Sequence, residues 1–341
     1  MRLRRLKLTA SIVAAMLAVV AAMFAWLWQQ RPPRMIDDWP APPEPGENRG
    51  TVLVTWLGVT TLLFDDGETQ ILIDGFFSRP TIAEILLRRP VDNDAAMIDF
   101  ALNEFQVRHL AAIIASHSHW DHAMDVGAVA NRTNASVLGS ESAANIARGA
   151  GVPEDQIVVA ETGEPYAFGD FRVTLLPSAH APIGWRGGTP LAGSVDEPLV
   201  MPQPITAMRE GGSFAIVIEH PQGTAIVQGS AGYVAGALDG VAADVVLASV
   251  FGLAEVDDEY SRGFWQTLVT RTGATSVYAL HFDDFTRPLG EILPWPYFIM
   301  DLEETGRLLE SFRDKWDKDT RLYLPEYGRP IAIYGHASSS T

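Results

Sequence analysis

The sequence contains no cysteine among its 341 residues. No disulfide can therefore form, and no thiolate is available as a nucleophile or as a metal ligand. Any metal site must be built from histidine, aspartate or glutamate, a ligand set that suits zinc, iron or manganese. The length, with 47% hydrophobic residues, is sufficient for one large domain or two small ones.

Basic residues are scarce beyond position 34. The whole chain has a formal net charge of −17, although its first 34 residues include six basic side chains and no acidic one. The rest of the chain is therefore more acidic than the total suggests. Such a surface repels phosphate backbones, so nucleic acid is not expected as a partner.

Charged residues are also absent from Leu8 to Trp28. About 20 apolar residues are long enough to cross a bilayer as a helix, whereas a cleavable signal usually has an apolar core of about 7–15 residues. We expect residues 1–31 to form a membrane anchor or an uncleaved signal, although the small residues Ala21 and Ala22 leave cleavage open. The basic residues before the run favour a cytoplasmic N-terminus. The remaining chain would then lie outside the cytoplasm, in the periplasm if the source is a Gram-negative bacterium.

The segment after the apolar run is rich in proline. Residues 32–50 are expected to form an extended, semi-rigid linker. We expect the folded domain to span residues 51–336 and to be followed by a short tail, 337–341. No pattern in the sequence indicates how many subunits assemble.

Beyond residue 51, apolar patterns predict strands and helices in alternation. Strands are expected at 51–57, 70–74, 110–115, 156–160, 171–176, 213–219, 224–228, 244–250 and 276–280. Helices are expected over most of 81–105 and at 122–131, 141–149, 260–272 and 302–316. Because sheet followed by helix occurs in both halves, we expect an α/β fold with two facing sheets and helices outside.

One polar motif follows directly on a predicted strand. The sequence ASHSHWDHAMD comes at the end of the strand expected at 110–115 and contains His117, His119, Asp121 and His122. Two histidines two positions apart on an extended chain point to the same side. The aspartate and the third histidine begin the next helix and can turn toward a second point nearby. The spacing therefore predicts a site for one metal ion or for two adjacent ones.

This motif resembles that of metal-dependent hydrolases with the metallo-β-lactamase fold. The resemblance extends over most of residues 51–290 and implies a four-layer αββα sandwich, in which two facing mixed β-sheets have helices outside. The sequences TWLGVTTLLF and ILIDGFFSRP look like the opening of the branch that includes N-acyl-phosphatidylethanolamine phospholipase D and the ascorbate-phosphate lactonases. That branch usually has a histidine after WLG, where this chain has Val59.

The same resemblance implies further site residues. His180 in LLPSAHAP and His281 in VYALHFDDF match the positions of two more metal ligands. Asp74, at the end of the ILID strand, would orient a ligand from outside the coordination sphere. The alternative for this residue is an ordinary turn aspartate before glycine.

The chain departs from the family pattern at Ser230. The family normally has a metal-bridging aspartate there, and a neutral serine is a poor bridge. The site therefore holds either one metal ion or two ions bridged only by hydroxide, an arrangement that resembles the lactamase subclass with only His and Asp ligands. In the two-metal arrangement, one ion would be bound by His117, His119 and His180, and the other by Asp121, His122 and His281.

The expected activity follows from these ligands. Zinc lowers the pKa of bound water to about 7, which supplies a metal-bound hydroxide at neutral pH. We expect this hydroxide to attack an ester, a lactone or a phosphodiester in a small-molecule or lipid-like substrate, with Asp121 as the catalytic proton acceptor. Two alternatives remain: a β-lactam-hydrolysing enzyme with an all-His/Asp zinc site, and a metal-binding scaffold without turnover.

The substrate pocket is expected beside His180. Residues 181–212 form a long segment rich in glycine and proline, and such loops often act as lids. Trp185 and Met201 on this loop, and Trp120 in the metal motif, are candidate substrate contacts. The alternative is a plain surface excursion of the chain.

The remaining histidines are expected to be structural. His109 precedes a predicted strand, His220 lies in the turn of EHPQGT and His336 lies near the end of the sequence, and none belongs to a cluster of histidines. Asp283 and Asp284 either orient His281 or form a polar turn.

Overall fold

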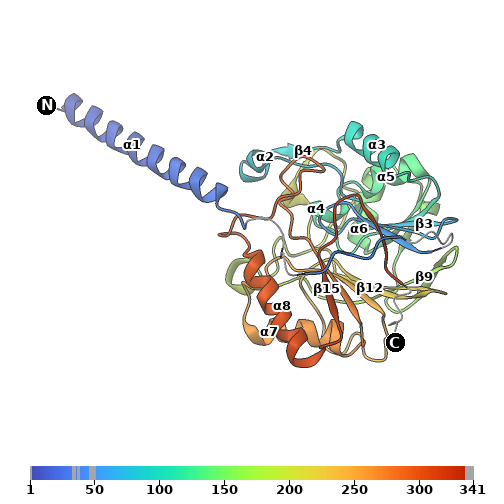
Figure 1. Ribbon diagram of the computed structural model, residues 1–341. Helices are drawn as coiled ribbons and strands as arrows, with labels where there is room; N and C mark the ends of the chain where they lie inside the picture. The colour runs from blue at the N-terminus through green and yellow to red at the C-terminus, as the bar shows by residue number, and fades with distance from the viewer. Residues whose placement is uncertain (1, 33–35, 37–38, 46–50, 335–341) are drawn as a thin grey trace.

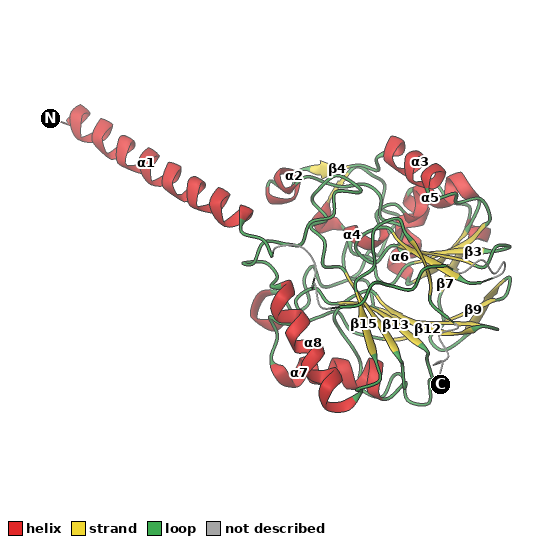
Figure 2. Ribbon diagram, in the orientation of Figure 1, coloured by secondary structure: helices red, strands yellow, loops and turns green. Residues whose placement is uncertain are grey.

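The computed structural model describes residues 2–32, 36, 39–45 and 51–334. Two seven-stranded sheets lie face to face, and helices cover their outer sides (Figures 1 and 2). The α/β sandwich expected from the sequence is confirmed.

The first sheet is mixed. Its strands, in order across the sheet, are β16 (Pro330–Ala332), β1 (Leu53–Trp56), β2 (Leu62–Asp65), β3 (Gln70–Ile73), β5 (Leu110–Ile114), β6 (Ser136–Gly139) and β7 (Ile157–Val159). The pairs from β3 to β7 are parallel and the others are antiparallel. Within the described residues, the last strand thus pairs with the first.

The second sheet is also mixed. Its strands, in order, are β15 (Arg321–Tyr323), β14 (Ser276–Leu280), β13 (Val245–Ser249), β12 (Gly223–Gln228), β11 (Phe214–His220), β9 (Phe171–Pro177) and β8 (Pro165–Phe168). The pairs from β12 to β15 are parallel. Parallel strands end at the same edge, so the loops after them gather there and can carry a site.

Helices α5 and α6 pack on the first sheet, and α7 and α8 lie beside the second (Figure 1). The helices of the domain are α2 (Ile82–Leu86), α3 (Ala95–Glu104), α4 (Trp120–Ala123), α5 (Val126–Thr133), α6 (Glu141–Gly149), α7 (Asp258–Trp265) and α8 (Leu302–Trp316). A small ribbon pairs β4 (Pro90–Val91) with β10 (Gln203–Pro204). Side-chain caps fix several helix starts; Thr81 and Glu84, for example, form a capping box on α2.

The buried core lies between the sheets and beneath the helices. Strand β5 illustrates why the chain folds this way, since all but one of its five apolar residues are buried. A continuous apolar run suits a central strand that is covered on both faces. Polar residues therefore begin abruptly where β5 ends, at Ser116 and His117.

The structure adds strands that the sequence pattern did not predict. β2 lies between the first two predicted strands, so the turn at Asp65–Gly67 joins β2 to β3 rather than β1 to β3. β6, β8, β15 and β16 are also additional, and each has only three or four residues. Strands this short show too little alternation to be recognised.

Two predicted helices are interrupted. The segment 81–105 contains α2 and α3 with β4 between them, because Pro90 cannot continue a helix. The helix expected at 122–131 begins at Trp120, ends after Ala123, and resumes as α5.

The N-terminal helix α1 (Arg2–Gln29) extends away from the domain (Figure 1). Its part Ser11–Gln29 is long and apolar enough to span a membrane, and none of it is buried in the protein. Its end is docked on the domain, with Trp28 edge-on to Trp295 at a centroid distance of 6.3 Å.

The segment after α1 is not a detached spacer where the structure describes it. Trp39 is buried and donates a hydrogen bond from Nε1 to Glu310 of α8 at 2.8 Å. A tryptophan that anchors the segment explains why it packs against α8, although its prolines predict an extended chain. Strand β1 begins two residues after the predicted domain start. The predicted domain end at residue 336 and the tail 337–341 lie outside the described residues.

Candidate metal centre

The polar motif occupies the turn between β5 and α4. His119 is the N-terminal cap of α4 and has an extended backbone, while Asp121 and His122 lie in the first turn of the helix. His117 and His119 point to the same side, with Nε2 of the former 3.1 Å from Nδ1 of the latter. The local geometry expected from the spacing is therefore present.

Two distant histidines join this motif. His180 lies after β9 and comes together with His117 and His119, so that one nitrogen from each lies within 4.8 Å of the others. His281 lies directly after β14 and joins Asp121 and His122 under the same limit.

The two groups adjoin one another. The rings of His117 and His122 are 3.9 Å apart, centroid to centroid. Asp121 Oδ2 lies 3.6 Å from His122 Nε2 and 3.4 Å from His281 Nε2. All six residues expected as ligands are thus brought together, in the two groups of three that the two-metal arrangement requires.

Protein oxygens lie beside the outer nitrogens of four of these imidazoles, those of His117, His119, His122 and His180. Nε2 of His119 lies 2.9 Å from the Pro190 carbonyl, and Nδ1 of His180 lies 2.9 Å from its neighbouring carbonyl, Ala181. A ring nitrogen that donates to a carbonyl leaves the other nitrogen with its lone pair free to bind a metal. These contacts therefore hold the rings of His119 and His180 in orientations that suit a metal site.

Asp74 supports His122 in this way. Its Oδ2 lies 2.8 Å from His122 Nδ1, and its Oδ1 accepts a hydrogen bond from the Ser116 amide at 2.8 Å. The Thr60 hydroxyl also donates to Oδ2. Asp74 is fully buried, so it is not a simple surface turn residue. Thr60 and Ser116 complete this network, and no sequence pattern identified them.

The charges in the cluster suit cation binding. Burial, followed by the neighbouring imidazoles, lowers the pKa of His117 well below its ordinary value. Burial also lowers the pKa of His180 to about 3 and lowers the pKa of His119. Burial alone would raise the pKa of Asp121, but His122 and other nearby imidazoles lower it overall. These three histidines therefore favour the neutral form and Asp121 the ionised one, the protonation states that metal binding requires.

His122 has the opposite shift. Burial would lower its pKa, but Asp121 and Asp74 outweigh burial and raise it. The two carboxylates therefore favour a positive charge at this position.

His281 is positioned through its backbone. Its amide donates to the Val59 carbonyl at 3.0 Å, and the Val59 amide donates to Asp283 Oδ1 at 2.8 Å. Asp283 thus fixes the backbone of this loop and not the imidazole of His281. Nδ1 of that imidazole has no hydrogen-bond partner among the described residues. Asp284 instead pairs with Arg31 at 2.6 Å.

Ser230 lies beside the cluster. It is buried, and its hydroxyl accepts a hydrogen bond from the Ala181 amide at 2.9 Å, one residue after His180. Its contact is therefore with the loop that carries this histidine. Asp121 is the one carboxylate in the two groups of three.

The aromatic residues expected in the pocket are not brought together. Trp120 is 6% exposed and packs edge-on against Phe76 and Phe285. Trp185 is 87% exposed. Met201 is partly buried and packs against the core. Their role as substrate contacts stays a prediction.

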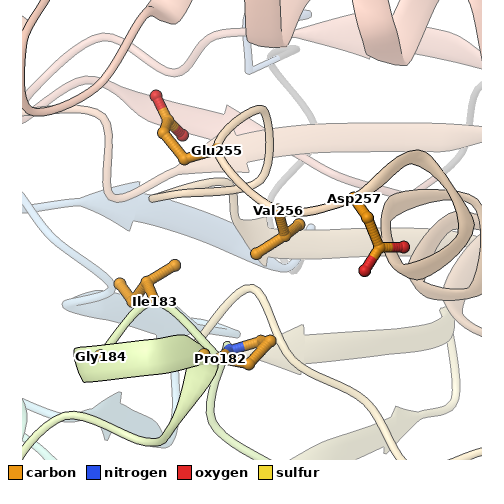
Figure 3. Close-up of a pocket in the computed structure, with 7 residues that line it drawn as sticks. Pro182, Ile183, Gly184, Glu255, Val256 and Asp257 are labelled. Atoms are coloured by element: carbon orange, nitrogen blue, oxygen red, sulfur yellow. The ribbon is translucent and has the colours of Figure 1, made fainter.

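A hollow of about 420 Å³ begins two residues after His180. Figure 3 shows its two walls, with Pro182, Ile183 and Gly184 on one loop and Val256 and Asp257 on the facing one. Its other lining residues are Gly187 and Glu255, so it contains two carboxylates and no lysine or arginine. Burial raises the pKa of Glu255.

The other histidines lie away from this cluster. His109 is exposed and directly precedes β5. His220 ends β11 and is close to two aspartates, which the sequence did not indicate. His336 lies outside the described residues.

Together, the αββα sandwich and the His/Asp cluster at its edge define a protein with a candidate metal centre. The sequence model of the metallo-beta-lactamase superfamily matches residues 54–225 of this chain, about half of its length. The chain belongs to this superfamily, as its motifs predicted.

Curated relatives match over part of the chain. A UPF0173 metal-dependent hydrolase of Heliobacterium modesticaldum is 29% identical over 121 residues, which cover 36% of this chain and 43% of the relative. A second, from Anaeromyxobacter dehalogenans, is 27% identical over 159 residues, which cover 43% of this chain and 52% of the relative. The chain spans about half the length of the curated relatives it matches.

Solved structures share the fold. The metallo-beta-lactamase fold protein YhfI of Bacillus subtilis has a TM-score of 0.50 at 13% identity, with 82% of this chain and 98% of that chain covered. An isothiocyanate hydrolase from Delia radicum gut bacteria has a TM-score of 0.50 at 15% identity, with 83% and 100% covered. Identities this low support the shared fold alone.

Proposed function

We propose that this protein is a metal-dependent hydrolase, with zinc as its metal and an ester, lactone or phosphodiester as its substrate. The observation that carries the proposal is the pair of His/Asp groups, each with its ligand atoms within 4.8 Å of one another. Histidine nitrogen and aspartate oxygen suit zinc, and the same donors also accept iron or manganese.

The six residues have distinct parts in this proposal. A bound divalent ion supplies Lewis acidity and activates water at neutral pH. His117, His119 and His180 would hold one ion, and Asp121, His122 and His281 a second. Asp121 also presents an ionised carboxylate that can accept a proton from the attacking water.

Asp74 sets the proton position on His122. Its carboxylate faces Nδ1 of His122 at 2.8 Å, so the neutral ring keeps its hydrogen there. The Nε2 lone pair is then directed toward Asp121. A carboxylate behind a ligating histidine fixes the ring and raises its basicity.

We take the hollow that begins at Pro182 as the substrate pocket, and its lining favours neutral substrates. Glu255 and Asp257 line it without any basic side chain, and the whole chain is acidic. A phosphodiester would carry its negative charge into this field, whereas an ester or lactone would not. We therefore rank neutral esters and lactones above phosphodiesters.

We also propose that α1 holds the enzyme at a membrane with the domain outside the cytoplasm. The exposed apolar span Ser11–Gln29 and the basic residues before it support this placement. Fractionation of cells that express the full chain tests it. Recovery in the membrane fraction is expected, and a soluble, unprocessed chain in the cytoplasm would contradict it.

Turnover of a substrate panel tests the hydrolase proposal. The full chain in detergent is assayed on chromogenic esters, lactones, bis-phosphodiesters and a cephalosporin. We expect hydrolysis of an ester or lactone that a chelator abolishes and zinc restores. His117→Ala should lose this activity, and His109→Ala, at an exposed position outside the cluster, should keep it.

The panel also separates the alternatives. Preferred turnover of the cephalosporin would favour the β-lactamase function that the Ser230 position suggests. Stoichiometric metal without turnover of any panel member would favour a metal-binding scaffold.

A further inference from the structure

A second group of metal-type side chains lies at the other end of the sandwich. It consists of Asp66, Asp170 and His220, each of which offers one ligand atom within 4.8 Å of the others. Asp66 lies in the β2–β3 turn of the first sheet, Asp170 in the β8–β9 turn, and His220 at the end of β11 in the second sheet. The group therefore joins residues that come from both sheets.

The position is remote from the candidate metal centre. The Phe214 amide, at the start of β11, donates to the Ser116 carbonyl beside His117, whereas His220 is at the opposite end of the same strand. At about 3.3 Å per residue, a strand of this length separates its ends by roughly 20 Å. A ligand held by His220 cannot take part in chemistry at the other edge.

The imidazole of His220 is buried with an unused nitrogen. Its side chain is 5% exposed, and Nε2 has no hydrogen-bond partner. Nε2 is directed at Asp66 Oδ2 at 3.6 Å, which is too long for a hydrogen bond. A buried polar atom without a partner is destabilising, so the arrangement calls for a third atom between the two.

The spacing suits an ion between them. Ligands in a tetrahedral zinc site lie about 2.0–2.2 Å from the metal, so two of them are roughly 3.4 Å apart. Asp66 is already oriented for this role, because its Oδ1 accepts from the amides of Glu68 and Thr69 while Oδ2 stays free to face His220. Asp170 is exposed and supplies a third ligand from the adjoining turn.

We propose that Asp66, Asp170 and His220 form a binding site for a divalent transition-metal ion, which links the two sheets. Binding requires one local change. Nδ1 of His220 accepts a hydrogen bond from the Gln222 amide at 3.2 Å. When Nε2 binds the ion, the ring hydrogen moves to Nδ1, so this long contact opens by a small rotation of the ring.

Zinc titration of the metal-free full chain in detergent tests the site. Calorimetry should show that the parent binds one more equivalent of zinc than Asp170→Asn. If the variant still binds this last equivalent, its affinity for it should be at least tenfold lower than that of the parent. Asp170 lies in an exposed turn, so its substitution is not expected to disturb folding. Glu68→Gln removes an equal charge from the neighbouring turn without removing a ligand, and it should match the parent.

Thermal unfolding gives a second measurement. Zinc should raise the Tm of the parent more than that of Asp66→Asn, whose amide oxygen can still accept from Glu68 and Thr69. Hydrolysis should be unchanged in both variants, and the metal count can be read even if no panel substrate is turned over. Equal zinc uptake and equal Tm shifts in the parent, Asp66→Asn and Asp170→Asn would overturn the proposal.

Discussion

The Asp74 carboxylate lies 2.8 Å from Nδ1 of His122, on the side of the ring opposite the metal cluster. This contact links the end of β3 to the first turn of α4. Through this contact, a buried carboxylate can set the tautomer of one candidate ligand.

Asp74→Asn is expected to weaken metal binding and the rate of hydrolysis by roughly 10–100-fold. The amide keeps the volume but removes the charge that favours the Nε2 lone pair. Metal content and turnover are measured together. Asp125→Asn is the control, because Asp125 is a buried carboxylate that accepts from Phe77, Ser78 and Asn93 instead. It should lower stability and leave the bound metal in place; a parental rate in Asp74→Asn would show that Asp74 is structural only.

His119→Ala and Asp121→Ala are each expected to abolish hydrolysis. Removal of a ligand opens the coordination sphere, and losses even outside that sphere cost roughly 10–100-fold. The purified parent should contain one to two equivalents of transition metal by elemental analysis, and dialysis against a chelator should remove both metal and activity. Activity at the parental level in Asp121→Ala would refute the proposed proton acceptor.

Ser230→Asp is expected to fold and to keep its metal. A carboxylate oxygen can replace the hydroxyl as acceptor for the Ala181 amide, and it adds a negative charge beside the loop of His180. The second equivalent of metal should therefore bind as tightly as in the parent or more tightly. Loss of all metal from this variant would show that the position does not correspond to the bridging site of the family.

Val59 has a left-handed backbone, with φ of 51°, and its side chain is fully buried. A β-branched residue is strained in this region, and glycine is not. We therefore expect Val59→Gly to be more stable than Val59→Ala by about 1 kcal/mol, since both lose the side chain and only glycine relieves the strain. Urea unfolding measures the difference.

The control is the same pair of substitutions at Val54, a buried residue of β1. In a regular strand the order should reverse, and Val54→Ala should be more stable than Val54→Gly by roughly 0.5–1 kcal/mol. The same order at both positions would show that backbone strain at Val59 contributes nothing measurable.

Stability is expected to fall between pH 10 and pH 12 in part because of Tyr260. Burial raises the pKa of this phenol to about 12, from about 10 in an unfolded chain. Between these values the unfolded state has lost the proton and the folded state retains it, so the free energy of unfolding decreases as pH rises. Tyr260→Phe should reduce this loss relative to the parent, as measured by unfolding at pH 8 and pH 11. Parallel pH profiles for the two proteins would contradict the assignment.

The sequence allowed the metal motif and much of the fold to be predicted. His117 through His122 are contiguous, and the apolar strands before the ligands are long enough to be recognised. His180 and His281 depended on the family resemblance, because nothing local marks a loop histidine as a ligand. The packing of Trp39 on Glu310 could not be predicted at all, since it joins residues far apart in the chain.

The same limit applies to residues outside the ligand set. Thr60 and Ser116 look like ordinary hydroxyl residues until β1, β3 and β5 bring them to Asp74. The one acidic residue next to His220 in its own hairpin is Glu219. The two aspartates that lie near its imidazole, Asp66 and Asp170, come from other turns. Polar networks of this kind are built by tertiary contacts, which local periodicity does not encode.

The pairing of Val54 with Ile331 has a consequence for how the protein is made. The first sheet is closed at one edge by β16, so a nascent chain on the ribosome cannot complete it before Ala332 has been synthesised. Long-range pairings of this kind form slowly. If the domain is exported as proposed, its first sheet would therefore close only after β16 has crossed the membrane.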